Sequence, residues 1–107
     1  MIIKETPVFT RRVIEILTDD EYKELQAMLA QQPDVGSIIP GGGGLRKVRW
    51  SIKGKGKRGG SRVIYYWFVE DESILMLFIF KKNERSDLTK EQLKQLRTIV
   101  EREYDEK

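Results

Sequence analysis

The residues best suited to chemistry lie in one stretch, residues 41–66, which reads GGGGLRKVRWSIKGKGKRGGSRVIYY. This stretch holds eight lysine and arginine residues, and no aspartate or glutamate occurs between residues 41 and 69. The formal charge of the chain is +3, so removing these eight cations leaves a net charge of −5 on the remaining residues. Clustered cations repel one another unless an anion lies among them. The stretch is therefore typical of a surface that binds a polyanion.

The residue types that are missing limit the chemistry available to these cations. The chain has no cysteine and no histidine, which excludes disulfides, thiolate metal sites and the usual acid–base side chain. We therefore expect neither a metal nor a cofactor. The apolar runs are far shorter than the ~20 residues of a membrane-spanning helix, and no secretory signal is visible. We expect one domain over residues 1–107, located in the cytoplasm without membrane contact.

A change in sequence period predicts the strands that position the cations. Apolar and polar residues alternate over residues 47–53, which predicts a strand with one buried face and one basic face. We expect a hairpin tip at 54–60, a second strand at 62–69, and a third strand at 74–80 that is buried on both faces. The apolar set of the first strand is Val48, Trp50 and Ile52, and its polar set is Lys47, Arg49, Ser51 and Lys53.

Capping signals predict three helices around these strands. Each start is marked by a threonine whose hydroxyl can accept a hydrogen bond from a free backbone amide. A short edge strand at 1–5 comes first, and residues 33–44 are expected to be a loop. The expected order is β-α-α-β-β-β-α, an α+β fold in which the helices pack on one face of an antiparallel sheet. The helix starts are Thr6 before Pro7, Thr18 with Glu21, and Thr89 with Gln92.

Lys47, Arg49 and Arg62 are the sharpest candidates for binding a phosphate. They lie on or at the start of paired strands, so the sheet can hold them in one rigid patch, and no carboxylate is near them in the sequence. The alternative is that they protect an exposed strand from aggregation. Tyr66 shares a strand face with Arg62 and is the best candidate for stacking on a base, although most aromatic residues of so small a sheet belong to its core.

Two glycine-rich segments and the end of the third strand supply further candidates. The segment GKGKRGG at 54–60 combines lysines with backbone that can approach a phosphate closely, and its alternative is a solvated hairpin tip. The four glycines at 41–44 lack the ending of a nucleotide-binding loop, which favours a flexible hinge. Lys81, Lys82 and Asn83 either join the patch or begin a solvated turn.

The segments GLRKVRW, GGSRVIYYW and FKKNERSDL, followed by a C-terminal helix, resemble in order and spacing the RelE/HigB family of bacterial toxins. The glycine-rich segment is most similar to the HigB-type branch. This resemblance implies a RelE-like fold and an endoribonuclease that cuts messenger RNA in the ribosomal A site. It also implies a cognate antitoxin with a helix-turn-helix DNA-binding domain, so that operator DNA is reached only through the antitoxin.

The resemblance also assigns roles to residues. Lys47 and Arg49 stand where the family has two strand lysines, and Arg62 stands where it has an arginine that opens the next strand. Lys82 or Lys81 matches the basic residue at the end of the last strand. Thr89 replaces a catalytic tyrosine of some members, which leaves the general base open between Lys47 and a loop lysine. The implied catalytic residues are Lys47, Arg62 and Lys82, and the implied RNA-binding residues are Arg46, Arg49, Lys53, Lys55, Lys57, Arg58, Tyr66, Lys81 and Asn83.

Two other functions fit the same basic segment. A non-catalytic RNA-binding module could use the basic hairpin without cutting its ligand. A toxin of the related ParE branch would instead inhibit gyrase and damage DNA. The concentration of cations on the strands favours the ribonuclease.

Overall fold

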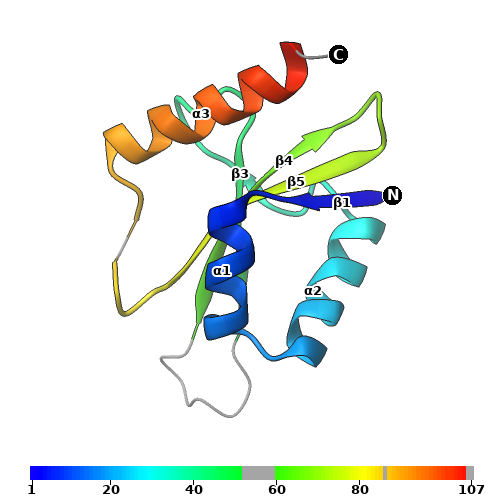
Figure 1. The fold of residues 1–107 in the computed structure, drawn as a ribbon, viewed down its shortest axis with the longest axis vertical. Helices are drawn as coiled ribbons and strands as arrows, with labels where there is room; N and C mark the ends of the chain where they lie inside the picture. Colours follow the sequence, from blue (N-terminus) through cyan, green and yellow to red (C-terminus); the bar gives the residue numbers. More distant parts are fainter. Residues whose placement is uncertain (52–59, 86, 106–107) are drawn as a thin grey trace.

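One mixed β-sheet and three helices make up the described part of the chain (Figure 1). The computed structural model describes residues 1–51, 60–85 and 87–105. The strands lie in the order β1-β5-β4-β3-β2. Within these residues, no helix is both long enough and apolar enough to cross a membrane. The elements are β1 (Ile2–Glu5), α1 (Pro7–Ile16), α2 (Asp19–Gln31), β2 (Ser37–Ile38), β3 (Arg46–Trp50), β4 (Ser61–Phe68), β5 (Ser73–Lys81) and α3 (Lys90–Asp105).

The centre of the sheet is the antiparallel meander β3-β4-β5 that the sequence predicts. Two other parts of the sheet differ from the prediction. The edge strand β1 pairs with β5 in parallel, because the whole of α1 to β4 intervenes and lets the chain return in the same direction. Residues Ser37–Ile38 form a short strand inside the expected loop. The sequence did not predict this strand, because two residues are too few to show an alternating pattern. The α+β class is confirmed, but the sheet is mixed.

The helices cover both faces of the sheet, so the prediction that they pack on one face is wrong. Helices α1 and α2 lie on one side of the sheet and α3 lies on the other (Figure 1). The physical reason is the composition of β4 and β5, whose residues are apolar in both alternating sets and therefore need cover on both faces. The first core joins Phe9, Val13, Leu25 and Leu29 to Val63, Tyr65 and Met76, and the second joins Leu96 and Val100 to Ile64, Leu75, Leu77 and Phe80.

The predicted helix starts are confirmed in detail. The backbone amide of Phe9 donates to Thr6, and the second helix has a full capping box between Thr18 and Glu21. At α3, the Gln92 amide donates to Thr89 Oγ1 at 3.0 Å, while Gln92 Oε1 accepts from the Thr89 amide at 2.9 Å. These signals were readable because each cap involves residues only three positions apart.

The glycine run before β3 forms a hydrogen-bonded turn that is anchored to α3, rather than the hinge favoured by the sequence. Arg97 of α3 donates to the Gly41 carbonyl at 3.2 Å, and the amide of Leu45 closes the turn onto the Gly42 carbonyl. Gly44 has φ +101°, and a Cβ built there would lie 2.8 Å from the Tyr66 ring. Glycine is therefore required at Gly44 by both backbone conformation and space.

Candidate functional site

Strands β3 and β4 direct three cations to the face of the sheet that carries α3, and the turn after β5 brings a fourth, Lys82, to the same pocket as Arg49 and Arg62. Arg49 of β3 lies directly opposite Arg62 of β4, and Lys47 lies opposite Ile64, whose side chain packs in the α3 core. The backbone amide of Lys82 donates to the Gly60 carbonyl at 3.0 Å, which holds the end of β5 beside the start of β4. We call Lys47, Arg49, Arg62 and Lys82 the cationic patch. Because directly opposed residues have Cβ atoms ~5 Å apart, the sheet holds Arg49 and Arg62 side by side.

An open pocket of about 480 Å³ lies at this end of the sheet. Its lining combines three members of the cationic patch with polar groups and one aromatic ring, so it offers several donors to an anion. Lys47 is not part of the lining, but it lies two residues before Arg49 on the same strand face. The lining residues are Arg49, Trp50, Ser51, Gly60, Arg62, Lys82 and Asn83.

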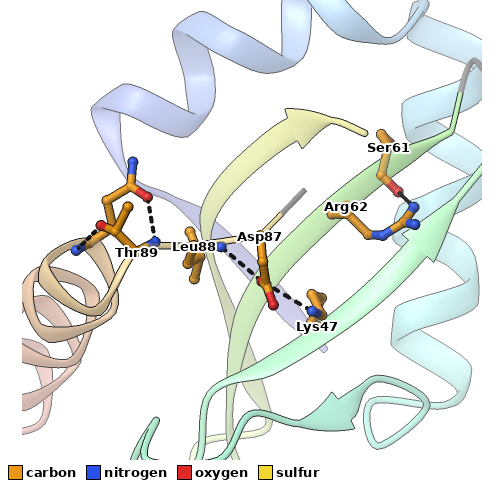
Figure 2. Close-up of polar contacts among 7 residues, drawn as sticks. Lys47, Ser61, Arg62, Asp87, Leu88 and Thr89 are labelled. Atoms are coloured by element: carbon orange, nitrogen blue, oxygen red, sulfur yellow. Dashed lines mark hydrogen bonds and ion pairs between the residues drawn. The ribbon is translucent and has the colours of Figure 1, made fainter. Parts of the chain in front are cut away.

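Lys47 is held by a carboxylate that the local sequence did not reveal. Its Nζ lies 3.2 Å from Oδ1 of Asp87, and the same oxygen accepts the Leu88 backbone amide at 2.8 Å (Figure 2). The Leu88 amide, followed by Lys47 and Arg62, holds the pKa of Asp87 below its usual value. Although no carboxylate is near Lys47 in the sequence, the fold brings Asp87 to it across forty residues.

Arg62 is more deeply buried than an exposed strand residue would be. It is only 9% exposed, and its Nη1 donates to the Ser61 carbonyl at 3.3 Å (Figure 2). Among the described residues no ion pair joins Arg62 to a carboxylate. Arg62 interacts with the Asp87 carboxylate only at longer range, and burying a guanidinium without a directly paired anion is unfavourable. The position of Arg62 therefore favours an anionic ligand in the adjacent pocket.

Three candidate residues lie away from the pocket. Arg46 shares the α1 and α2 side with Val48, and its Nη1 donates to the carbonyls of Asp34 and Gly36 at 3.1 and 2.8 Å. Tyr66 packs in the α3 core, with its ring 4.7 Å from that of Phe68. Lys81 is exposed and does not line the pocket. Arg46 lies away from the pocket because strand alternation directs it to the other face of the sheet. Tyr66 lies away from the pocket because its side chain packs in the core beneath α3.

Of the remaining residues, Thr89 is a helix cap, and the others lie outside the described residues. Thr89, which stands at the tyrosine position of the resemblance, caps α3 through its hydroxyl (Figure 2). The basic residues of the hairpin lie outside the described residues, so their expected phosphate contacts stay predictions. They are Lys53, Lys55, Lys57 and Arg58.

Sequence reasoning also missed a second ionic contact that holds the segment after β5. Arg12 of α1 donates from Nε to the Ile79 carbonyl at 2.6 Å and forms an ion pair with Glu84. Its guanidinium lies 4.9 Å from the centroid of Phe78, and Arg85 lies 5.5 Å from the same ring. These partners are about seventy residues apart along the chain, so no local pattern could have identified them.

Comparison with known proteins gives a family match over most of the chain. Residues 30–106 match the family model described as "RelE toxin of RelE / RelB toxin-antitoxin system". The matched region contains the whole cationic patch and Asp87. The fold is similar to a chain of the crystal structure of the intact E. coli RelBE toxin-antitoxin complex, with a TM-score of 0.56, 12% sequence identity, and coverage of 75% of this chain and 94% of that chain. At this identity the structural likeness concerns the fold.

Proposed function

The chain belongs to the RelE toxin family. From this premise we propose that it is the toxin of a type II toxin–antitoxin system. We propose further that it acts as an endoribonuclease on messenger RNA at the ribosome. The observation that carries the proposal is the meeting of Arg49, Arg62 and Lys82 at one open pocket, with Lys47 beside them. A phosphodiester is the anion that such a set of fixed cations suits best. Because the proposed substrate is messenger RNA on the ribosome, the proposed place of action is the cytoplasm.

The reaction that these residues suit is attack of a ribose 2′-oxygen on the adjacent phosphorus. A base takes the 2′-hydroxyl proton, the 2′-oxygen–phosphorus bond forms, and the phosphorus–5′-oxygen bond breaks. The products are a 2′,3′-cyclic phosphate and a 5′-hydroxyl, which receives a proton from an acid. Arg62 stabilises the extra negative charge of the pentacoordinate phosphorane, a type of contact worth about 3 kcal/mol or more. Lys82 protonates the leaving 5′-oxygen.

The other cations bind and position the substrate. Arg49 is exposed at the pocket and contacts the RNA backbone. Lys47 is a candidate for the base, and a lysine of the hairpin is the alternative. For Lys47 to reach a ribose 2′-hydroxyl, its Nζ must first leave the Asp87 carboxylate that it contacts. The general base is therefore either Lys47 or a lysine of the hairpin.

Two partners complete the proposed function. The ribosome positions messenger RNA in its A site, which removes much of the entropic barrier to reaction and explains why cleavage of free RNA should be weak. A cognate antitoxin neutralises the toxin, as the RelE/RelB description of the family indicates. We propose that the antitoxin carries the DNA-binding domain of the pair, so that this chain reaches operator DNA only through it.

The proposal is tested by mapping cleavage of ribosome-bound messenger RNA with purified protein. We expect the wild type to cut within the A-site codon, and Arg62→Ala and Lys82→Ala to reduce the cleavage rate about 100-fold or more. Because Arg62 is buried, Arg62→Lys and a thermal unfolding curve separate lost catalysis from lost folding. Arg11→Ala, on exposed α1 surface of the other layer, is the matched control for charge.

Each rival function has its own result in this experiment. RNA that is bound but never cut would identify a non-catalytic RNA-binding module. DNA damage on induction, with intact messenger RNA, would identify a gyrase inhibitor. If both the Arg62→Ala and Lys82→Ala variants cut as fast as the wild type, the catalytic roles given to these residues are wrong.

A further inference from the structure

The carboxylate of Asp87 is bound in the way that a phosphate would be bound at the cationic patch. Its Oδ1 accepts from both Lys47 Nζ and the Leu88 amide, and Arg62 adds attraction at longer range (Figure 2). An ammonium group and a backbone amide are also the donors that commonly hold a phosphate oxygen. In the described structure, Asp87 thus serves as the anion for one member of the patch.

The contact between Asp87 and Lys47 is exchangeable. The Lys47 side chain is 30% exposed and that of Asp87 is 61% exposed, so water reaches both groups. An exposed ion pair of this kind changes an equilibrium by about fivefold or less. A phosphate that arrives at Lys47 can therefore displace the carboxylate, but it must compete with it.

The terms of this competition depend on how the phosphate is delivered. Asp87 is attached to the segment that joins β5 to α3, so its effective concentration at Lys47 is constant and high, in the millimolar range typical of short connections. RNA dissolved at micromolar concentration competes poorly with such a group. RNA that is already fixed beside the patch has a high effective concentration of its own and competes well.

We propose that Asp87 is a specificity-determining residue, whose carboxylate holds the place of a ribonucleotide phosphate on Lys47 and so disfavours free RNA relative to RNA positioned on the ribosome. This inference rests on the proposed function for its substrate and adds the residue that sets the preference. An aspartate is already ionised at neutral pH, and the Leu88 amide, Lys47 and Arg62 lower the pKa of Asp87 further. The competing anion is therefore present at neutral pH.

The test compares Asp87→Asn with the wild type on two forms of RNA. Asparagine keeps the size of the side chain and an oxygen for the Leu88 amide, but it removes the charge. For a labelled single-stranded 2′-O-methyl RNA, which cannot be cut, we expect the Asp87→Asn variant to bind more tightly, by up to about fivefold. The plot of log Kd against log salt concentration should become steeper by about 0.7, as for one added phosphate contact.

Cleavage measurements then test the preference itself. The ratio of the rate on free RNA to the rate on ribosome-bound RNA should rise by up to about fivefold in the Asp87→Asn variant. Asp20→Asn removes the same charge from the first turn of α2, on the other layer, and should change neither Kd nor this ratio. In a Lys47→Ala background the Asp87→Asn substitution should lose its effect, because the competing contact no longer exists.

Three results would overturn the inference. The first is an Asp87→Asn variant that binds the RNA no more tightly than Asp20→Asn while unfolding at the wild-type temperature. The second is an unchanged ratio of free to ribosome-bound cleavage. The third is an Asp87→Asn effect of the same size with and without Lys47. Failure of the wild type to cut any ribosome-bound RNA would instead overturn the proposed function, whereas the binding comparison would still decide whether Asp87 competes for phosphate.

Discussion

Single positions on β3 decide whether a cation lies on the α1 and α2 side of the sheet or at the pocket. Arg46 and Arg49 are three residues apart, so strand alternation directs them to opposite faces of the sheet. Arg46 donates two hydrogen bonds to the carbonyls of Asp34 and Gly36 and so ties the segment before β2 to the sheet. Arg49 is exposed at the pocket. The same residue type therefore lies in two different environments within one short strand.

Substituting these two arginines should separate stability from RNA binding. Arg46→Ala removes hydrogen bonds from a charged donor and should lower the free energy of unfolding by about 1.5–3 kcal/mol, while RNA affinity stays at the wild-type value. Arg49→Ala should leave stability within about 0.5 kcal/mol and reduce the salt dependence of RNA binding by about 0.7 in slope. Urea unfolding and RNA titrations measure both quantities. The reverse pattern would contradict the assignment of faces.

At the scale of elements, the segment between β5 and α3 is held at two points. Near β5, the ion pair of Arg12 with Glu84 joins it to α1, and the backbone amide of Lys81 also donates to the Glu84 carboxylate at 2.8 Å. Near α3, Asp87 joins it to β3. Lys82 and Asn83 of the pocket lie in this segment, next to the contacts of Glu84. The position of the pocket lining therefore depends on contacts with elements far away in the sequence.

The first of these two points should be sensitive to acid. The Lys81 amide, followed by Arg12, lowers the pKa of Glu84, so its contribution to stability is complete above the usual glutamate value and is lost as the pH falls through the lower folded-state pKa. Glu84→Gln should melt below the wild type at pH 7, and this difference should shrink below pH ~4.3. Melting curves between pH 7 and 3 measure it, with Glu15→Gln on exposed α1 surface as the charge control. A difference that is constant over this range would contradict the prediction.

At the scale of the whole molecule, the sheet separates two cores, and the sequence predicted the elements better than their arrangement. Caps and strand alternation are local, so the helix starts and the β3-β4-β5 meander were readable. The side of the sheet on which α3 packs, and the pairing of Lys47 with Asp87, depend on residues far apart in the sequence. The cations of the site were readable by type, but the counter-anion among them was not, because a long-range contact leaves no periodic pattern.

Because the two cores lie on opposite sides of the sheet, core substitutions on the two sides should affect RNA affinity differently. Leu25 of α2 is fully buried in one core, and Leu96 of α3 is 7% exposed in the other. Replacing either by alanine should lower the free energy of unfolding by about 2–5 kcal/mol, because both leave a cavity. Only Leu96→Ala should also alter RNA affinity, since α3 begins three residues after Asp87 and fixes the segment that carries it.

The comparison is made at a temperature where both variants remain folded, by RNA titration together with hydrogen exchange of the amides in residues 82–89. We expect Leu96→Ala to speed exchange in that segment and to tighten the binding of free RNA, because a loosened segment competes less well for Lys47. Leu25→Ala, as the matched loss of core volume on the opposite side of the sheet, should do neither. Equal effects of the two substitutions on RNA affinity would mean that the site responds to overall stability and not to the docking of α3.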